Sequence, residues 1–304
     1  MQIPAFQGVV NVTCTPFDDA GKVDIKAWAK HLDFVVKQGV HAIMPHGSTG
    51  EYYALTTDER KAGLKFVAEH VGKKVPLYAG TNSARPAEIV ELSNFAKDAG
   101  YRAIMLAAPY YSLPGPTELV NHFKFIANNT DLPIILYNFP ARTGVDMTKD
   151  FLEGVADVKA ICAIKESSGS FARMLEHIVF FEDRFQRIAG ADDQAVDAFL
   201  WGAKCWIAGA SNCLPAEHVA LYRTCVEKQD FIGGKKLMHA MIPLLYLLEN
   251  GGKYIQYVKY GCELAGSPVG ITRQPLEALT TDEKAKFKKL WDAVKTSPAM
   301  KAAA

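Results

Sequence analysis

The sequence predicts an α/β fold, a (β/α)8 TIM barrel with a C-terminal helical extension. Short apolar segments alternate with longer amphipathic ones eight times in roughly 220 residues. The apolar segments are nearly continuous, which is typical of parallel strands covered on both faces. No change in composition marks a linker between two domains, and eight such units in this length fit a closed barrel.

Each predicted strand is a short β-compatible run that ends in a turn, and the runs occupy residues 8–17, 42–47, 75–81, 103–109, 133–139, 160–165, 185–191 and 205–211. Each run is followed by a segment with apolar residues at helical spacing, at 24–39, 56–72, 84–100, 117–130, 148–157, 170–183, 192–202 and 216–229. A doubly wound open sheet is the alternative, but the G-x-G-x-x-G turn expected after its first strand is missing.

The pattern after residue 230 is helical only, which predicts two or three helices packed beside the barrel. We therefore expect a barrel at 1–229, a helical extension at 230–297 and a loose tail at 298–304. The apolar faces of these helices fit burial against the barrel or against a partner subunit, and the sequence leaves both possibilities open.

The composition excludes several classes of protein. The chain has 304 residues, a formal net charge of +1 and no Lys/Arg-rich block, so neither nucleic acid nor an anionic membrane is expected as a partner. No apolar run approaches the roughly 20 residues that span a bilayer, and the N-terminus has no signal-peptide pattern. The six scattered cysteines, without a C-x-x-C pair, are expected to be buried free thiols of a cytoplasmic protein rather than metal ligands.

The chemistry of such a barrel lies where the strands end, on the loops that lead into the helices. Lys165 ends the buried run 160–165, where its charge is costly. Burial favours the neutral amine, which can attack a carbonyl carbon and form a Schiff base. The alternative is a lysine that extends to solvent or pairs with Glu166.

Other polar residues at strand ends suit the same reaction. Tyr137, one strand earlier, is placed to act as a general acid/base during imine formation. Ser48 and Thr49, in a G-S-T-G turn, offer hydroxyl and backbone N–H groups to a carboxylate. Arg142 can bind a second carboxylate. The alternatives are wall packing for the tyrosine, an ordinary polar turn and a solvated loop arginine.

These residues belong to a series of motifs: TPF near the start, then GSTGE, PYY, YNFPARTG, IKESSG and GADD. In order and spacing the series resembles the dihydrodipicolinate synthase/N-acetylneuraminate lyase family of class I pyruvate aldolases, over nearly the whole chain. The resemblance implies a TIM barrel with a C-terminal helical extension, no cofactor, and a homotetramer built from tight dimers.

The resemblance also implies roles for single residues. Lys165 corresponds to the Schiff-base lysine, Tyr137 to the proton donor and acceptor, and Ser48 to a relay hydroxyl. Tyr111, the second tyrosine of PYY, would complete the relay from the neighbouring subunit of the tight dimer. Serine at position 48 is a mild departure from the threonine usual in the synthases, since it also supplies a hydroxyl.

Substrate contacts follow from the same resemblance. Gly47, Ser48 and Thr49 would hold the pyruvate carboxylate, and Ile207 would line the pyruvate pocket. Arg142 matches the arginine with which the synthases bind the carboxylate of aspartate semialdehyde, and neuraminate lyases generally lack it. The resemblance therefore favours condensation of pyruvate with aspartate semialdehyde, a step of lysine biosynthesis.

Two departures from the family pattern bear on this activity. GKYIQYVKYG, residues 252–261, lacks the proline of many biosynthetic synthases, which raises the alternative of a catabolic relative acting on a 2-keto-3-deoxy sugar acid or a hydroxyproline-derived 2-oxo acid. The lysine-feedback site of the family is also altered, so strong inhibition by lysine is not expected. The residues at that site are Tyr52, Tyr53, Thr57, Arg60, Ala84 and Glu88, of which only Glu88 is retained.

Two rival classes of function predict other patterns. A metal-dependent aldolase needs clustered His, Asp and Glu at strand ends, and of the histidines only His46 lies at one. Asp192 and Asp193 fit helix caps, so no metal is expected. A non-catalytic ligand-binding barrel would be expected to lose Lys165 or Tyr137, and both are present.

Overall fold

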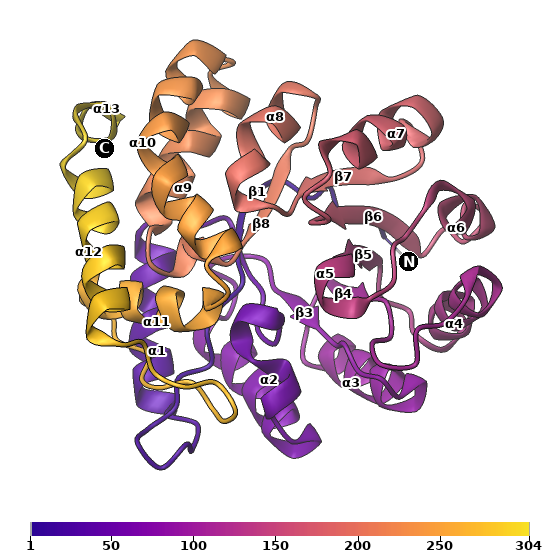
Figure 1. The fold of residues 1–304 in the computed structure, drawn as a ribbon. Helices are drawn as coiled ribbons and strands as arrows, with labels where there is room; N and C mark the ends of the chain where they lie inside the picture. The colour runs from indigo at the N-terminus through magenta and orange to yellow at the C-terminus, as the bar shows by residue number, and fades with distance from the viewer. Residues whose placement is uncertain (1, 304) are drawn as a thin grey trace.

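The computed structural model describes residues 2–303 and shows a barrel of eight parallel strands surrounded by helices (Figure 1). The strands are β1 Gly8–Asn11, β2 Ala42–Ile43, β3 Tyr78–Gly80, β4 Ala103–Ala107, β5 Ile134–Asn138, β6 Ile161–Glu166, β7 Gln186–Ala189 and β8 Cys205–Ala208. They pair in the order β2-β1-β8-β7-β6-β5-β4-β3. A parallel bridge between Ile43 and Leu77 connects β2 with the start of β3, so the predicted barrel is confirmed.

Helices connect the strands, and all of them except the short α5, which lies over the end of the barrel, form the outer layer (Figure 1). They are α1 Ile25–Lys37, α2 Thr57–Val71, α3 Pro86–Asp98, α4 Pro116–Asn129, α5 Pro140–Thr143, α6 Lys149–Gly154, α7 Phe171–Phe181, α8 Ala195–Leu200 and α9 Pro215–Tyr222. Short 3₁₀ turns follow three strands, and a π-helical turn extends α9; they are η1 Ser48–Gly50, η2 Tyr52–Ala54, η3 Asp192–Gln194, η4 Ala210–Asn212 and η5 Arg223–Glu227. The strand β2 is shorter than the predicted run 42–47, because Pro45 lacks an N–H group and His46 has a positive φ of 60°.

Side chains along each strand alternate between the barrel interior and the layer beneath the helices. On β5, Tyr137 belongs to the interior cluster and Leu136 to the outer one. On β8, Ile207 lies in the interior and Trp206 in the outer layer. Lys165 pairs in register with Tyr137 across β5 and β6, so the alternation directs both side chains to the inside of the barrel.

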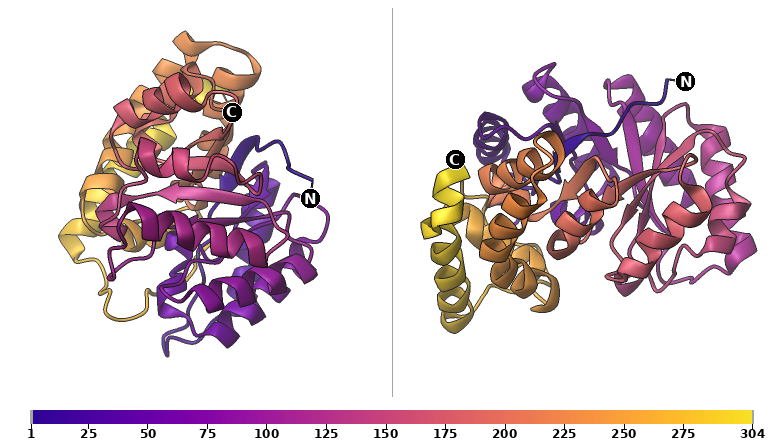
Figure 2. Two further views of the ribbon diagram at one scale, coloured as in Figure 1. Left: turned by 90° about the vertical axis from the view of Figure 1, so that its right-hand side faces the viewer. Right: turned by 90° about the horizontal axis from the view of Figure 1, so that it is seen from above.

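Four further helices follow the barrel: α10 Phe231–Asn250, α11 Tyr254–Leu264, α12 Thr281–Thr296 and α13 Pro298–Ala303. They stack against one side of it, next to α9 (Figures 1 and 2). The helix α10 contacts α8, α9 and η3, and α11 contacts η4. The extension therefore reaches the loops that follow β7 and β8, at the mouth of the barrel.

The helix α10 is long and apolar enough to cross a membrane by length and composition alone, with a mean hydropathy of 1.2. Its leucines Leu244, Leu245 and Leu248 are buried within the fold. The same apolar face thus packs onto the barrel and the other C-terminal helices, as in the core helix of a soluble protein.

The end of the chain differs from the prediction. Pro298–Ala303 form the short helix α13 rather than a loose tail. Met300 is buried, and α13 contacts α10 and α12. Burial of this one apolar side chain gives the segment a packing surface that its alanine-rich sequence does not suggest. Ala304 lies outside the described residues.

Candidate active site

The loop after β2 brings two hydroxyl groups to the mouth of the barrel. A Cβ atom at Gly47 would lie 2.4 Å from Cγ1 of Val12, so only glycine fits there. The 3₁₀ turn η1 then places Ser48 half-buried and Thr49 buried. The three predicted residues of the G-S-T turn thus lie together.

A buried ion pair fixes this loop. Glu51 has a positive φ of 54° and no exposed surface. Its Oε1 lies 2.7 Å from Nζ of Lys259 on α11, and its Oε2 accepts a hydrogen bond from the backbone N–H of Arg273 at 3.0 Å. Lys259 also donates to the backbone oxygen of Thr15 at 2.9 Å. The C-terminal extension therefore anchors the loop that carries Ser48.

Lys165 is buried at the end of β6, beside Tyr137. Its Nζ lies 4.3 Å from the centroid of the Tyr137 ring. Burial lowers the pKa of Lys165 to about 8, and the negative charges of Asp192 and Glu249 oppose this shift. The amine is therefore neutral in a far larger fraction of molecules than an exposed lysine at the same pH.

Tyr137 is buried in the same pocket. Burial raises its pKa, and the nearby Glu249 carboxyl raises it further. The Ser48 hydroxyl, which interacts with the Tyr137 side chain, and the charge of Arg142 oppose the rise. The phenol is therefore protonated at neutral pH, which suits a proton donor next to a forming imine.

Two further residues predicted around the pocket, Ile207 and Arg142, differ in their exposure. Ile207 is fully buried in the interior of the barrel. Arg142, in the short helix α5, is exposed, and its guanidinium carbon lies 6.0 Å from the centroid of the Phe139 ring. Arg142 forms no ion pair within residues 2–303, although its charge acts on Tyr137. It is available to an anion at the mouth of the barrel.

Tyr111 is the predicted site residue that the structure does not bring into the pocket of its own chain. Its side chain is 97% exposed, and its φ is 71°. Leu113, two residues later, is also exposed and has a φ of 46°. Residues other than glycine adopt such backbone angles only at a cost in free energy. The loop therefore holds Tyr111 away from the barrel in a strained backbone conformation.

Sequence reasoning missed three residues of the site. Asp192, read as a helix cap, is almost fully buried; its Oδ1 accepts a hydrogen bond from Trp206 Nε1 at 2.9 Å and its Oδ2 one from the Tyr254 hydroxyl at 2.7 Å. Glu249, at the end of α10, accepts a hydrogen bond from the Asp192 backbone N–H at 3.2 Å. Burial and the charge of Asp192 raise the pKa of Glu249 to about 8.

The sequence signals for these three residues differ in strength. GADD stands at a strand end, so Asp192 carries a usable signal. Glu249 and Tyr254 carry none, because nothing in the sequence says where the extension meets the barrel. Within the described part of the chain, no group of three or more His, Cys, Asp and Glu side chains is arranged to hold a metal ion.

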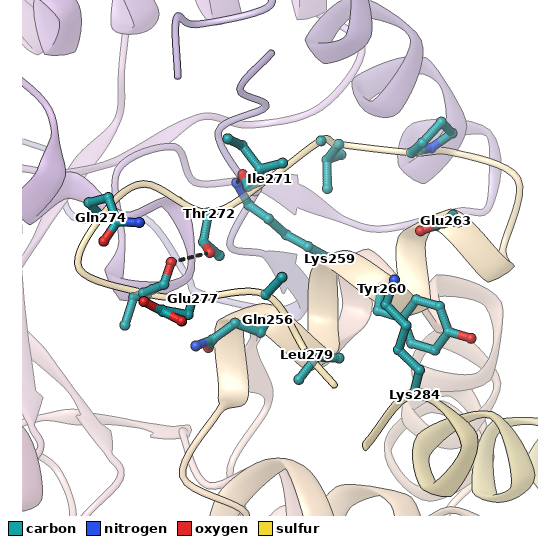
Figure 3. A pocket seen from close by; sticks show the side chains of 15 residues that line it. Gln256, Lys259, Tyr260, Glu263, Ile271, Thr272, Gln274, Glu277, Leu279 and Lys284 are labelled. Atoms are coloured by element: carbon teal, nitrogen blue, oxygen red, sulfur yellow. Dashed lines mark hydrogen bonds between the residues drawn. The ribbon is translucent and has the colours of Figure 1, made fainter. Parts of the chain in front are cut away.

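A cleft of about 560 Å³ lies away from Lys165, between α11, the segment 268–279 and the start of α12 (Figure 3). Lys259 extends along it, with its amine engaged by Glu51. The segment is held in part by a hydrogen bond from the Thr272 hydroxyl to the backbone oxygen of Leu276, at 3.1 Å. The amine of Lys259 is therefore already paired and is not free to bind an anion in this cleft.

A buried amine with a lowered pKa beside a phenol, at the mouth of a (β/α)8 barrel, defines a lyase site of the Schiff-base type. The chain belongs to the Dihydrodipicolinate synthetase family, whose sequence profile matches residues 5–294. The family resemblance seen in the motifs is thereby confirmed.

Known relatives cover almost the whole chain. The 4-hydroxy-tetrahydrodipicolinate synthase of Methanosarcina mazei is 34% identical over 285 residues, 93% of this chain and 96% of that protein. The 4-hydroxy-tetrahydrodipicolinate synthase structure from Methylacidiphilum fumariolicum SolV superposes with a TM-score of 0.91 at 29% identity and covers 98% of both chains. YagE of E. coli K12, a family member solved in complex with pyruvate, gives a TM-score of 0.91 at 28% identity over 97% of this chain and 100% of that one.

Proposed function

We propose that the protein is a 4-hydroxy-tetrahydrodipicolinate synthase, which condenses pyruvate with aspartate semialdehyde through a Schiff base on Lys165. The buried Lys165 amine carries the proposal, because its pKa is lowered to about 8 and it lies 4.3 Å from the Tyr137 ring centroid. Full-length relatives with this activity support the choice of substrates, and so does the pyruvate complex of YagE.

The residues at the barrel mouth suit each step of this reaction. The neutral Nζ of Lys165 attacks C2 of pyruvate, and the resulting carbinolamine loses water to form an iminium ion. Tyr137 donates the proton that the departing hydroxyl takes, and Ser48 beside it passes protons on. The Tyr137 phenolate left by this step takes a proton from C3, which gives an enamine, and C3 of the enamine attacks the aldehyde carbon of the second substrate. The new alkoxide takes a proton from Tyr137. The amino group of the second substrate then displaces Nζ of Lys165 at C2, which closes the ring and frees the lysine. Gly47 and Thr49 hold the pyruvate carboxylate, and Ile207 packs against its carbon chain.

The position of Arg142 favours a second substrate that is an aldehyde with a carboxylate group. Its guanidinium is exposed at the mouth and close enough to Tyr137 to act on its pKa. A planar guanidinium can bind a carboxylate through two parallel hydrogen bonds. Aspartate semialdehyde presents such a group, whereas a neutral sugar aldehyde does not.

We also propose a cytoplasmic homotetramer of tight dimers, in which Tyr111 completes the proton relay of the neighbouring subunit. The exposure of Tyr111 and its positive φ support this, since its own barrel gives the ring no packing partner to offset the backbone cost. Val179 and Phe180 on α7 offer an apolar surface for the second interface. The six cysteines are all buried and unpaired, as fits a reducing compartment.

The test is a linked assay with pyruvate, aspartate semialdehyde, dihydrodipicolinate reductase and NADPH. We expect NADPH oxidation by the wild-type protein and none by Lys165→Ala, which has no amine to form the imine. If no oxidation occurs while borohydride still traps pyruvate on Lys165, the imine chemistry stands and aspartate semialdehyde is the wrong acceptor. Failure of both readouts would contradict the proposal as a whole.

The same assay, titrated with lysine, is expected to show no strong inhibition. Arg60 is buried where the family's feedback site lies, and it donates to the backbone oxygens of Asn82 and Gly80 at 2.8 and 3.1 Å. The Glu88 carboxylate already accepts hydrogen bonds from the hydroxyls of Thr57 and Ser83, at 2.6 and 2.7 Å. The ammonium group of a lysine inhibitor would lie near the Arg60 guanidinium, and Glu88 already accepts two hydrogen bonds, so neither group favours its binding.

A further inference from the structure

The C-terminal extension places a hydroxyl group in the space beside Thr49. Gly209 directly follows β8, two residues after Ile207. A Cβ atom at Gly209 would lie 2.5 Å from Oγ1 of Thr49 and 2.5 Å from the hydroxyl oxygen of Tyr254. The two hydroxyl groups therefore fill the space that a side chain at position 209 would take, and they lie no farther apart than twice that distance.

The Tyr254 hydroxyl is held firmly in this place. It donates a hydrogen bond to Oδ2 of Asp192 at 2.7 Å, and hydrogen bonds to an ionised acceptor are about twice as strong as neutral ones. Asp192 is itself fixed, because it also accepts hydrogen bonds from Trp206 Nε1 at 2.9 Å and from the backbone N–H of Ala210 at 3.2 Å. The Asp192 backbone N–H in turn donates to Glu249.

The Tyr254 hydroxyl uses its hydrogen in the bond to Asp192, so its oxygen can only accept a hydrogen bond from a group in the pocket. A phenol hydroxyl has one hydrogen to donate and lone pairs with which to accept. The oxygen therefore presents lone pairs to the space that it shares with Thr49. Such an acceptor orients a neighbouring hydroxyl group and limits its rotation.

We propose that Tyr254 is a positioning residue of the active site: clamped by Asp192, it closes the β8 side of the pyruvate pocket and fixes the Thr49 hydroxyl for the substrate carboxylate. The inference rests on the proposed function, since it takes Thr49 as a carboxylate contact. It adds a residue of the C-terminal extension to a site otherwise built from the barrel.

Borohydride trapping of pyruvate tests this role without an aldehyde. Adduct on the purified protein is measured by mass spectrometry over a series of pyruvate concentrations. Tyr254→Phe keeps the ring and removes the hydroxyl. We expect it to raise the half-saturating pyruvate concentration about tenfold, as for loss of one hydrogen bond to a charged group, with the adduct at saturation unchanged.

Tyr257→Phe is the matched control. It removes a hydroxyl from a buried tyrosine of the same helix, whose ring stacks on Phe287 with centroids 5.5 Å apart. We expect wild-type half-saturation for this variant. Gly209→Ala gives an independent second variant, because its Cβ would displace both Thr49 and Tyr254, and it too should raise the half-saturating concentration.

The outcomes separate this inference from the proposed function. Wild-type half-saturation in both Tyr254→Phe and Gly209→Ala would overturn the positioning role and leave the imine chemistry intact. The positioning role would also be overturned if Tyr254→Phe lowered the adduct at saturation without changing the half-saturating concentration. Failure of the wild-type protein itself to trap pyruvate would overturn the imine chemistry, and this inference with it.

Discussion

Glu249 is a carboxyl group placed so that its protonation state acts on the amine of Lys165. Burial and the charge of Asp192 raise its pKa to about 8, close to the lowered pKa of Lys165. Below that pH the carboxyl is uncharged and leaves the Lys165 amine free of its influence. Above it, the ionised carboxylate stabilises the protonated amine and so works against attack on pyruvate.

We therefore predict that Glu249→Gln lowers the pH midpoint of imine formation. The neutral amide cannot stabilise the charged amine, so the pKa of Lys165 should fall, by roughly half a unit or more for a charge at this range. The rate of borohydride trapping, followed over a pH series from mildly acidic to alkaline, measures this midpoint. Glu263→Gln, which removes a charge from a residue of α11 that is not buried, should leave the midpoint unchanged. An unshifted midpoint in Glu249→Gln would contradict the prediction.

The same substitution has a consequence for stability. The folded protein binds the Glu249 proton more tightly than the unfolded chain does, because the pKa rises from 4.5 to about 8 on folding. Stability contributed by this site is therefore fully present below pH 4.5 and lost as the pH rises towards 8. We predict that Glu249→Gln gains stability relative to the wild type as the pH is raised from 4.5 to above 8, as measured by urea unfolding. A stability difference that does not change over this range would argue against a buried ionisable Glu249.

Among single residues, the sequence predicted those that lie in motifs. It did not predict those whose role depends on contacts with residues distant in the chain. Lys165 was predicted because a lysine at the end of a buried strand is costly, and Tyr137 because it lies near the end of the strand just before it in the barrel. Tyr254 lies in a helix with other aromatic residues, and only its contact with Asp192, 62 positions earlier, marks it out. The sequence shows which chemical groups stand at strand ends, but it does not show which distant residues contact each other.

The loop η1 and the helix α11 are joined by one buried ion pair. Glu51 and Lys259 have 0% and 3% of their side-chain surfaces exposed. Removing one member of such a pair leaves a buried charge without its counter-ion, which typically costs about 3–5 kcal/mol, roughly half of the stability of many proteins.

We predict that Lys259→Met destabilises the protein by about 3–5 kcal/mol, measured as the free energy of unfolding in urea. Lys288→Met is the comparison, since its ion pair with Asp292 is half exposed and surface pairs contribute about 0–1 kcal/mol. The double variant Glu51→Gln/Lys259→Met should recover part of the loss, because no charge is left unpaired. Equal effects of Lys259→Met and Lys288→Met would contradict a stabilising role for the buried pair.

At the scale of elements, the sequence located helices better than strands. The helix predicted at 24–39 is observed as Ile25–Lys37, because Asp24 caps its first turn by accepting from two backbone N–H groups. The strand predicted at 8–17 pairs only over Gly8–Asn11. Apolar composition continues past the ladder into the loops of the mouth, since these are buried as well, and composition alone does not show where backbone pairing ends.

The whole molecule presents one feature that a single chain does not explain. Tyr111 stands out from the surface of its own barrel. If it serves the site of a second chain, the Lys165 and Tyr111 of one active site belong to different subunits. Mixed dimers of two inactive variants then contain one intact site.

We predict that Lys165→Ala and Tyr111→Phe subunits, unfolded and refolded together, regain activity that neither has alone. In the mixed dimer, the Tyr111→Phe subunit keeps its Lys165 and receives an intact Tyr111 from its partner. The linked reductase assay measures the recovery, and refolding each variant by itself is the control. No recovery in a mixture shown to contain mixed dimers would place Tyr111 in its own subunit or outside the relay.

The barrel itself was predictable because its signal is distributed over the entire chain. Eight alternations of apolar strand and amphipathic helix leave few other topologies, and local errors at element ends do not change the count. The extension was predictable as helices, but not as part of the site. Its position depends on single contacts such as Glu51 to Lys259, which leave no periodic trace in the sequence.

The buried pair between Glu51 and Lys259 joins an early and a late part of the chain, which has a consequence for the protein during its synthesis. All eight strands leave the ribosome before residue 259 does. Until then, Glu51 has no cation, and the turn that carries Thr49 lacks both its anchor and the Tyr254 hydroxyl. We expect a nascent chain to acquire pyruvate binding only as α11 docks, so translation that stops short of this helix yields a protein without a working site.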